Sequence, residues 1–597
     1  MANMTTRLFR LAALAAAALL AGTCLAQGLP VVLGEPARTE KQVEAPRLRM
    51  TPPAAIQRVQ LAPVTDADVE SVRAENRRAR IADDNRVNPK RVVVGINRGL
   101  EVETAAKELG WTNVADGRAA RLAVTSPDAA AMRVAIDLLG VSTDVEMVFF
   151  GSQSPERLFG PYRVGEIADR GIPWWSPMTE GETLTVEFFA PGQGAGSDPR
   201  IAGVGHLFTN PAERGIDKRL QDIGDAGSCN VDIPCSALDA SSAFRNVAES
   251  VAQMVFADSG FTVLCTGTLL NDMDASTQKP WFFSANHCFD NTSAPFKTAA
   301  QMQAVAGTLT TLWFFEASAC GSSAVNPGWQ QVGGGATYLY SNVQSDALFL
   351  RLNGQPPSGA FFAGWDANAV SVGSAAVGIH HPQGDLKKVS QGSIVGFARW
   401  DSTSTANQYI EIRWSSGTTE GGSSGSAFFT LTGSQYLLRG GLRGGSALCT
   451  NPGGTDFFSR FDQIYPAISQ YLSAPASVTP FANVTALWWI PSESGWGLNL
   501  IHRSSSNIVF GTWYTYGADG KRTWFLMTSG SWSSPKTYSG TLYATSGPAF
   551  TGPFDPALVT ITPVGTGTLT FSDANNATWT YSVNGLSGTK SIRRFEF

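Results

Sequence analysis

The stretch Gly421-Gly422-Ser423-Ser424-Gly425-Ser426-Ala427 is the one on which the predicted fold depends. It follows a strand-like run, Tyr409 to Trp414, and precedes the apolar pair Phe428-Phe429. A serine in a glycine-rich turn can present its hydroxyl while neighbouring backbone N–H groups converge on one point, which is the geometry that acyl transfer requires. Such turns are also common in linkers and hairpins, so a catalytic role for this one depends on residues upstream.

Two residues upstream complete a pattern with Ser424. An apolar run ends in Asn286-His287-Cys288, so a histidine stands at a strand end beside a cysteine, where it would be held in place and could act as a general base. Asp346 opens another apolar run, Ala347 to Leu352, where a carboxylate can orient an imidazolium. Singly, these residues also fit a core histidine and a turn aspartate. In this order, however, they match the triad of the chymotrypsin-like double β-barrel, whereas other hydrolase triads run differently.

Length and composition point to a multidomain, mainly β chain. Its 597 residues exceed what one hydrophobic core supports, so we expect roughly three or four domains. The 61 glycines and the aromatic content of 10% favour β-rich, turn-rich domains. Charged residues make up 16% and the net charge is −5, which argues against a nucleic-acid or anionic-membrane partner.

The first residues are typical of a secretory signal. A short apolar run, Leu11 to Leu20, follows two arginines and precedes a small-residue cleavage site, so residues 1–26 are predicted to be a signal peptide. A lipoprotein anchored at Cys24 is the weaker alternative. No other stretch of about 20 apolar residues occurs, so no transmembrane segment is predicted. The chain is expected outside the cytoplasm, secreted or periplasmic.

Six cysteines remain after signal removal, all in one part of the chain. An even number in an exported protein predicts three disulfides, and six cysteines allow 15 pairings. A zinc site is not favoured, because the one close pair has no matching second pair. The six are Cys229, Cys235, Cys265, Cys288, Cys320 and Cys449.

The residues before this cysteine-bearing part have a different character. Residues 27–226 contain no cysteine after the signal, and helical and strand-like patterns alternate, which predicts an α/β region. Helices are expected over Asp66–Asp84, Val102–Leu109 and Asp128–Leu139, and strands over Arg91–Ile96, Val145–Phe150 and Leu184–Phe189.

Two further regions follow. Residues 227–472 predict many short strands, as in a β-barrel or sandwich, with a closing helix over Phe461–Leu472. Residues 473–484 form a predicted linker. Residues 485–597 lack cysteine, are rich in Trp, Tyr, Thr and Gly, and alternate as antiparallel strands do.

Residues 227–472 resemble the lysyl endopeptidases, secreted bacterial lysine-specific serine proteases of chymotrypsin-like fold. Many separate motifs agree in order, which makes the resemblance specific. These motifs are Gly227-Ser228-Cys229-Asn230-Val231-Asp232-Ile233-Pro234-Cys235, Leu264 to Asn271, Ala285-Asn286-His287-Cys288, Ser345-Asp346, Ile379-His380-His381-Pro382 and Glu420 to Ser426.

The resemblance implies the role of each catalytic residue. His287 would be the base, Asp346 the orienting acid and Ser424 the nucleophile, with the backbone N–H groups of Gly422 and Ser424 as the oxyanion hole. It also implies the disulfides Cys229–Cys449, Cys235–Cys320 and Cys265–Cys288.

The substrate pocket departs in part from the family pattern. The family's pocket aspartate falls on Asp456, although the loop from Cys449 is shorter here. Trp400 matches a family tryptophan beside the active site, and Arg443 replaces the histidine that accompanies it. We expect Arg443 either to crowd the site or to reach toward Asp456, which leaves the choice between Lys and Arg substrates open. A solvated loop carboxylate is the alternative for Asp456.

Neither a metal nor a cofactor is predicted. His380 and His381 invite a metal hypothesis, but adjacent residues of a strand point to opposite faces, and the resemblance makes both structural.

The prediction is therefore a self-processing serine endopeptidase acting on protein or peptide substrates, with residues 27–226 as propeptide. Lys218-Arg219 is a suitable self-cleavage site. The last region resembles a β-rich repeat of secreted bacterial proteins, and its aromatic residues suit either a carbohydrate- or surface-binding face or its own core. The rival hypotheses are an inactive protease homologue that binds, and an adhesin acting through residues 485–597.

Overall fold

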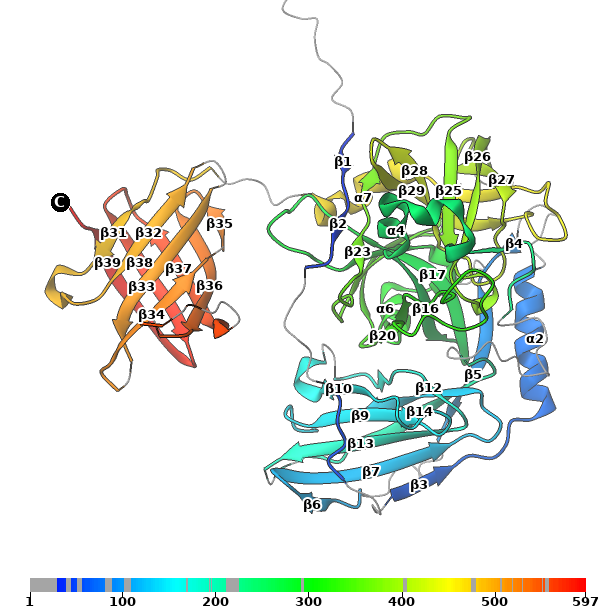
Figure 1. The fold of residues 1–597 in the computed structure, drawn as a ribbon, viewed down its shortest axis with the longest axis horizontal. Helices are drawn as coiled ribbons and strands as arrows, with labels where there is room; N and C mark the ends of the chain where they lie inside the picture. Colours follow the sequence, from blue (N-terminus) through cyan, green and yellow to red (C-terminus); the bar gives the residue numbers. More distant parts are fainter. Residues whose placement is uncertain are drawn as a thin grey trace, which may run out of the picture. The chain divides into compact units, whose positions relative to one another are not determined.

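The computed structural model divides the chain into two compact units, Met1–Ser473 and Ala474–Phe597, and each is described by itself (Figure 1). Within the first unit, residues 27–226 are called the N-terminal segment and residues 227–472 the central segment. The structure describes residues 29–38, 45–50, 56–80, 88–100, 109–167, 170–192, 194, 196–210, 225–290, 295–400, 405–473, 479–504, 507–517, 519–528, 530–549, 551–552, 554 and 558–596. The predicted signal peptide, Lys218-Arg219 and most of the helix expected at 102–109 lie outside these residues.

The N-terminal segment is built mainly on strands. One sheet has the order β10-β9-β13-β7-β3, with β6 added beside β7. Its hydrophobic side chains, such as Val124, Phe149 and Phe188, have no exposed surface. The strands are β3 (Ile56–Gln60), β6 (Thr112–Val114), β7 (Gly117–Thr125), β9 (Glu146–Gly151), β10 (Phe159–Arg163) and β13 (Thr183–Pro191).

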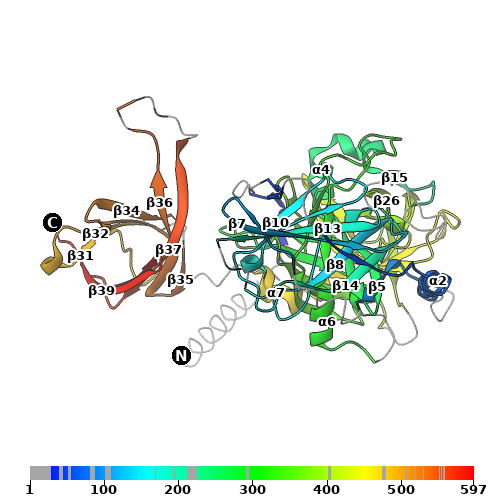
Figure 2. The ribbon, with the colours of Figure 1, turned by 90° about the horizontal axis from the view of Figure 1, so that it is seen from below.

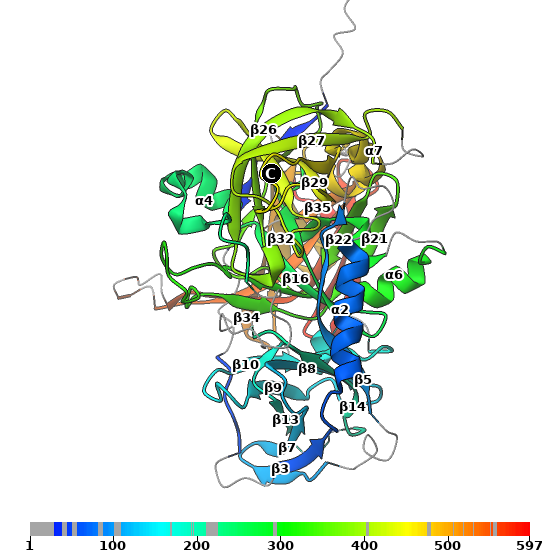
Figure 3. The same ribbon diagram turned by 90° about the vertical axis from the view of Figure 1, so that its right-hand side faces the viewer.

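The helix expected at Asp66 forms as α2 (Asp66–Arg80). Thr65 and Asp68 cap it reciprocally: the Thr65 backbone N–H donates to Asp68 Oδ2 at 2.8 Å, and the Asp68 N–H donates to Thr65 Oγ1 at 3.2 Å. The helix lies alongside β5 (Val92–Gly99), where Asn76 bonds both the N–H and the carbonyl of Val93 (Figure 3).

The helix expected at Asp128–Leu139 is wrong. The chain there forms β8 (Ala131–Asp137), which pairs with β14 (Arg200–Leu207) on one side and with β11 (Trp174–Trp175) and β12 (Thr179–Glu180) on the other. Alanine favours a helix locally, but strands on both edges supply backbone partners and bury nearly the whole run, so tertiary context decides.

The central segment begins with a barrel that shares a sheet with the N-terminal segment. The order β11-β8-β14-β5-β17-β16-β19-β20 runs from one segment into the other, and β5 pairs antiparallel with β17. β18 and β22 continue the barrel from β17, and β21 pairs with β22. Its strands are β16 (Val251–Asp258), β17 (Phe261–Leu270), β18 (Trp281–Ser284), β19 (Thr310–Trp313), β20 (Gln330–Val332), β21 (Ala336–Asn342) and β22 (Ala347–Leu352).

A second sheet follows, with the order β24-β29-β28-β25-β26-β27-β30 and a further pairing of β29 with β30. The predicted closing helix forms as α7 (Phe461–Leu472), with Pro466 inside it. The strands are β24 (Trp365–Asp366), β25 (Ala375–His380), β26 (Lys388–Ala398), β27 (Tyr409–Ser416), β28 (Ala427–Thr432), β29 (Gln435–Gly445) and β30 (Asp456–Ser459). These two closed β structures are the mainly β, chymotrypsin-like architecture that the sequence predicts.

The N-terminal segment also meets the second sheet. β1 (Val31–Val32) pairs with β24, and β2 (Glu35–Pro36) pairs with β23 (Phe361–Phe362). β4 (Asn88–Pro89) pairs with the end of β29. The described N-terminal residues therefore contribute strands to both halves of the central segment.

The second unit forms its own antiparallel sheet, which Figure 2 shows curling round on itself. Its core contains fully buried Trp488, Trp579 and Tyr538. Part of its aromatic content thus fills its own interior, while Tyr514, Tyr516 and Trp524 are exposed. The strands are β31 (Ala486–Trp489), β32 (Gly497–Arg503), β33 (Ile508–Tyr516), β34 (Arg522–Met527), β35 (Gly530–Ser534), β36 (Thr537–Ser546), β37 (Thr560–Phe571), β38 (Asn576–Val583) and β39 (Leu586–Arg594). In the described part of the chain, no helix has the length and apolar character needed to span a membrane.

Candidate active site

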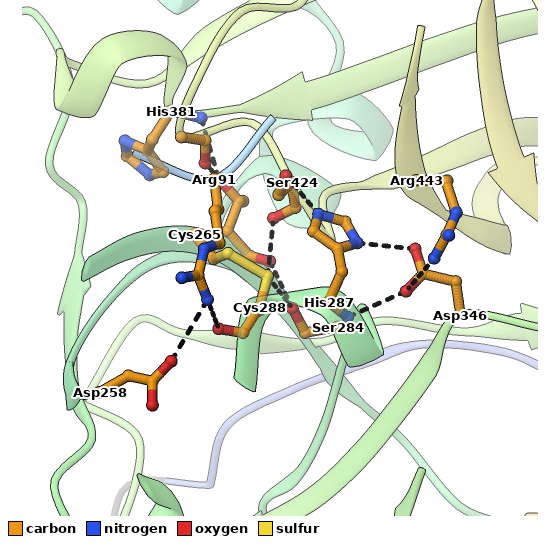
Figure 4. Close-up of a disulfide and its surroundings, with 12 residues drawn as sticks. Arg91, Asp258, Cys265, Ser284, His287, Cys288, Asp346, His381, Ser424 and Arg443 are labelled. Carbon is orange, nitrogen blue, oxygen red and sulfur yellow. Dashed lines mark hydrogen bonds and ion pairs between the residues drawn. A yellow bond between two sulfur atoms is a disulfide. The ribbon is translucent and has the colours of Figure 1, made fainter. Parts of the chain in front are cut away.

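Three side chains from different elements meet in one hydrogen-bonded row (Figure 4). His287 lies on the single-turn helix α5 (Asn286–Phe289), directly after β18. Its Nδ1 is 2.8 Å from Asp346 Oδ2, and its Nε2 is 2.6 Å from Ser424 Oγ. An imidazole between a carboxylate and a serine hydroxyl can accept the hydroxyl proton while the carboxylate stabilises the resulting cation.

Asp346 is fixed by its surroundings. It stands at the turn before β22 with φ 53°, is fully buried, and accepts the backbone N–H of His287 on Oδ1 at 2.9 Å. Burial raises the pKa of Asp346, but the charges of His287 and Arg443 and the hydrogen bonds from His287 outweigh it, so the pKa lies below its ordinary value. The carboxylate is thereby kept charged beside the imidazole.

Arg443 does not reach toward Asp456, which corrects one expectation from the sequence. Its Nη1 lies 3.0 Å from Asp346 Oδ1 (Figure 4). Its guanidinium lies over the Trp400 ring, 4.2 Å from the centroid. The contact with Asp346 is an ion pair without good hydrogen-bond geometry, since Nη1 has no hydrogen-bond partner among the described residues. Arg443 and Trp400 together thus support the carboxylate side of the row.

The turn that carries Ser424 needs its glycines. Gly422 has φ 89° and Gly425 has φ 80°, conformations that side-chain-bearing residues rarely adopt. A Cβ on Gly425 would lie 2.0 Å from Ser284 Oγ. The Ser424 carbonyl accepts the N–H of Thr266 on β17 at 2.8 Å, which ties the turn to the first barrel.

Two backbone N–H groups of this turn point at one acceptor, the carbonyl oxygen of Lys90. The N–H of Ser424 donates to it at 3.2 Å, and the N–H of Gly422 donates to the same oxygen. Paired donors around a carbonyl beside a serine hydroxyl are the arrangement that stabilises an oxyanion in acyl transfer. The residues assigned to this role from the sequence therefore converge on a peptide carbonyl.

The Lys90 side chain fills a buried pocket that ends at Asp456. Lys90 Nζ lies 2.7 Å from Asp456 Oδ1, and both side chains are almost fully buried. The other carboxylate oxygen accepts from Trp414 Nε1 at 2.7 Å and from Thr419 Oγ1 at 2.6 Å. Burial lowers the pKa of the Lys90 ammonium, and the charge of Asp456 opposes that shift. The solvated-loop alternative for Asp456 is thus wrong.

All six cysteines of the central segment are paired. Cys229 bonds Cys449, Cys235 bonds Cys320 and Cys265 bonds Cys288, which are the pairings that the resemblance implies. Cys288 directly follows His287, and Cys265 lies on β17, so the third bond joins α5 to the barrel wall. The disulfide restrains the backbone that carries the imidazole.

Comparisons with known proteins identify the family of this chain. A family model described as the lysyl endopeptidase C-terminal domain matches residues 223–459, and one described as the lysyl endopeptidase N-terminal domain matches residues 60–205. Lysyl endopeptidase of Pseudomonas aeruginosa is 35% identical over 393 residues, which cover 63% of this chain and 81% of that protein. The chain belongs to the lysyl endopeptidase family. Membership makes it a protease.

Within this lysyl endopeptidase fold, His380 and His381 are both buried, and each has its own hydrogen-bond partners. His380 contacts Ser423 Oγ at 2.9 Å and Ser390 Oγ at 3.0 Å, and burial lowers its pKa to about 3. His381 Nδ1 lies 3.2 Å from the carbonyl of Asp385, and burial lowers the pKa of His381 well below its ordinary value. The described residues contain no group of three or more His, Cys, Asp or Glu side chains placed to hold a metal ion.

Sequence reasoning missed one residue of this site, Lys90. It lies in a run, Asn88 to Arg91, with no catalytic motif, and only its tertiary position gives it significance. The signal that could have found it is a basic pair, Lys90-Arg91, immediately before a strand in a chain expected to prefer basic residues.

Proposed function

We propose that this family member is a secreted serine endopeptidase that cleaves peptide bonds after basic residues, lysine first. The observation that carries the proposal is the placement of one residue. Lys90 presents its carbonyl oxygen to the Gly422 and Ser424 N–H groups and its ammonium to Asp456, beside the row Asp346–His287–Ser424. The carbonyl of a lysyl peptide would thus meet the Gly422 and Ser424 N–H groups, and its ammonium would meet Asp456.

The proposed reaction follows from these contacts. Ser424 Oγ attacks the carbonyl carbon while His287 Nε2 takes the hydroxyl proton, and the Gly422 and Ser424 N–H groups stabilise the negative oxygen. His287 then gives the proton to the leaving amine, and the acyl-enzyme on Ser424 remains. A water molecule, deprotonated by His287, hydrolyses the ester and restores the serine. Asp346, whose pKa is held below its ordinary value, stays charged and stabilises the imidazolium.

The pocket supports lysine over arginine. Lys90 Nζ donates to Asp456 Oδ1 at 2.7 Å, to Thr419 Oγ1 at 2.6 Å, to the Thr419 carbonyl at 2.9 Å and to the Ala447 carbonyl at 2.8 Å. Acceptors gathered around one point suit a compact ammonium with three donors, whereas a planar guanidinium spreads its donors over a fork. An apolar side chain would leave Asp456 buried without a cation, which costs several kcal/mol.

The remaining assignments of the proposal concern the other regions. Residues 1–26 would direct export, residues 27–226 would act as a propeptide, and 485–597 would be an accessory β domain after a linker at 473–484. The alternative, an inactive homologue that binds, is disfavoured by the complete row of His287, Asp346 and Ser424. The adhesin hypothesis remains the second alternative: Trp488 and Trp579 of the C-terminal unit are buried, whereas Tyr514, Tyr516 and Trp524 are exposed.

The test is hydrolysis of three peptides that differ only in Lys, Arg or Leu before the scissile bond. Processed wild type is expected to cleave the lysyl peptide fastest and the leucyl peptide slowest. Ser424→Ala should lower kcat by at least about 10⁴-fold, because nothing else in the site can form the acyl-enzyme. Preference for the leucyl peptide would refute the role of Asp456 in selecting a basic side chain. An unchanged rate in Ser424→Ala would refute the serine mechanism.

A further inference from the structure

We propose that the Lys90–Arg91 peptide bond of the N-terminal segment is bound as a substrate of the chain's own active site and is cleaved there in cis. The inference rests on the proposed function, which it extends by naming one internal bond as the enzyme's first substrate. Neither the family match nor the basic pair at Lys218 assigns this bond.

The residues before the bond bind as an added strand. β4 pairs antiparallel with β29, with Pro89 opposite Gly444 and Asn88 opposite Gly445. Strand addition fixes the register of a peptide through its main chain, while a pocket selects one side chain. Here the selected side chain is Lys90, which is 3% exposed and makes the four contacts described above. A Cβ on Gly445 would lie 2.2 Å from Asp456 Oδ1, so this glycine leaves the pocket open.

The bond itself lies at the reacting groups. The Lys90 carbonyl oxygen accepts from both donors of the Ser424 turn, and Ser424 Oγ is hydrogen-bonded to His287. Ser424 is fully buried and His287 is 1% exposed, so the serine is closed to other peptides while Lys90 is in place. The peptide carbonyl held by the two donors of the Ser424 turn is therefore one of the chain's own.

The residues after the bond are held as firmly as those before it. The Arg91 guanidinium lies 3.3 Å from Asp258 Oδ2 and 3.4 Å from the Cys288 carbonyl (Figure 4). It also lies 3.2 Å from Glu75 Oε1 on α2. β5 then continues between β17 and β14. Both sides of the bond are thus anchored, as in a bound peptide that spans an active site.

Cleavage would balance as ordinary peptide hydrolysis. Ser424 Oγ bonds to the Lys90 carbonyl carbon, the bond to the Arg91 nitrogen breaks, and the proton passes from Ser424 through His287 to that nitrogen. Water then releases Lys90 as a carboxylate, and the serine regains its proton. The products are a carboxyl-terminal Lys90 and an amino-terminal Arg91, and the strands on either side, β4 and β5, keep their pairings with β29 and β17.

The experiment uses the full chain, expressed with export and analysed by intact-mass and amino-terminal peptide mass spectrometry. Wild type is expected to give a fragment ending at Lys90 and one starting at Arg91. Ser424→Ala and Lys90→Gln should give neither fragment. Lys90→Arg is the second variant, for use if Lys90→Gln fails to fold, and it should give both fragments but form them more slowly. Lys107→Gln, which changes another lysine of the same segment, should cleave as wild type does.

Two further readouts show whether the cut is intramolecular. The first-order rate should not change over a 20-fold dilution of the precursor, and Ser424→Ala chain mixed with wild type should keep its own Lys90–Arg91 bond intact. Rates that rise in proportion to concentration would overturn the cis assignment.

The outcomes also separate this inference from the proposed function. An intact Lys90–Arg91 bond in a preparation that hydrolyses the lysyl test peptide overturns the inference and leaves the function standing. Equal cleavage in Ser424→Ala also overturns it, because a host protease would then be responsible. If neither the internal bond nor any lysyl peptide is cleaved, the proposed function fails and the inference fails with it.

Discussion

The two regions that flank the central segment differ in how they relate to it. The described N-terminal segment contributes β1, β2, β4 and β5 to sheets of the central segment and places Lys90 against Asp456. The C-terminal unit pairs its described strands only with one another, around its own core. The N-terminal segment is built into the sheets of the central segment and into the candidate active site, and the C-terminal unit folds around a separate interior.

This difference indicates which flank should influence the activity of the protease. A strand shared between two segments couples their folding, because neither side has a complete set of backbone partners without the other. A unit with its own core and its own sheet has no such dependence. We therefore expect changes in the N-terminal segment to alter the protease, and changes in residues 474–597 to leave peptide hydrolysis alone.

The largest expected effect comes from deleting each flank. Removing residues 27–226 from the gene should abolish recovery of active enzyme, because β17 loses its neighbour β5 during folding and the barrel edge stays open. Removing residues 474–597 should leave kcat/KM for a lysyl peptide within about twofold of wild type, as expected for independent units. The activity of both deletion variants is measured on the same peptide. An equal loss of peptide hydrolysis in both deletion variants would contradict the difference between the two flanks.

The next largest effect is expected from the substitution Asp456→Asn, which tests the contact between the N-terminal segment and the pocket. It removes the anion that faces Lys90 and, in the proposed function, the substrate cation. Leaving a buried cation unpaired costs about 3–5 kcal/mol, so kcat/KM for the lysyl peptide should fall by about 10²–10⁴-fold. The leucyl peptide serves as the control and should change little. A uniform fall on both peptides would instead indicate general damage to the site.

Loss of the Cys265–Cys288 disulfide should have a smaller effect, confined to one unit. The bond closes a loop with a sequence separation of 23, so replacing both cysteines by alanine should lower the free energy of unfolding of the first unit by about 2–4 kcal/mol. The C-terminal unit, which has no cysteine, should keep its melting temperature. Differential scanning calorimetry resolves the two transitions. A shift of both would contradict the independence of the units.

The smallest effect is a dependence of stability on pH. Burial lowers the folded-state pKa of His380 to about 3, whereas the unfolded value is 6.5, so the unfolded chain binds the proton first as pH falls. Stability from this residue is complete above pH 6.5 and declines below it by about 1.4 kcal/mol per pH unit until the folded pKa is reached. Between pH 6.5 and 5 the contribution of His380 to the stability of the first unit should therefore fall by about 2 kcal/mol.

His380→Asn is the matched variant for this pH dependence. Its unfolding free energy should vary less steeply between pH 6.5 and 5 than that of wild type, by denaturant titration of the first unit. An identical slope in wild type and variant would show that His380 titrates normally in the folded chain.

Much of the fold could be predicted from local pattern. The strands at 281–284 and 347–352 and the helix at 461–472 form where alternating or apolar runs predict them, because there the local preference and the tertiary environment agree. Asp128–Leu139 shows the opposite case, since its alanines favour a helix but strands on both sides make it β8. Neighbouring strands from distant sequence cannot be seen in a local window.

The candidate site divides in the same way. The order of His287, Asp346 and Ser424 predicts their convergence, and the structure brings the three side chains together, while their catalytic roles remain predictions. Arg443 pairs with Asp346, and the cation that meets Asp456 is Lys90. Lys90 itself could not be predicted, since its meaning depends on a strand pairing across more than 300 residues of sequence.

The most direct test of the central claim is covalent labelling of the processed enzyme with a fluorophosphonate, followed by mapping of the adduct by peptide mass spectrometry. The proposal predicts one adduct, on Ser424, that forms in wild type, is lost in His287→Ala and forms more slowly in a precursor whose Lys90 still fills the pocket. An adduct on another residue, or none in a preparation that hydrolyses the lysyl peptide, would contradict the assignment of Ser424 as the nucleophile.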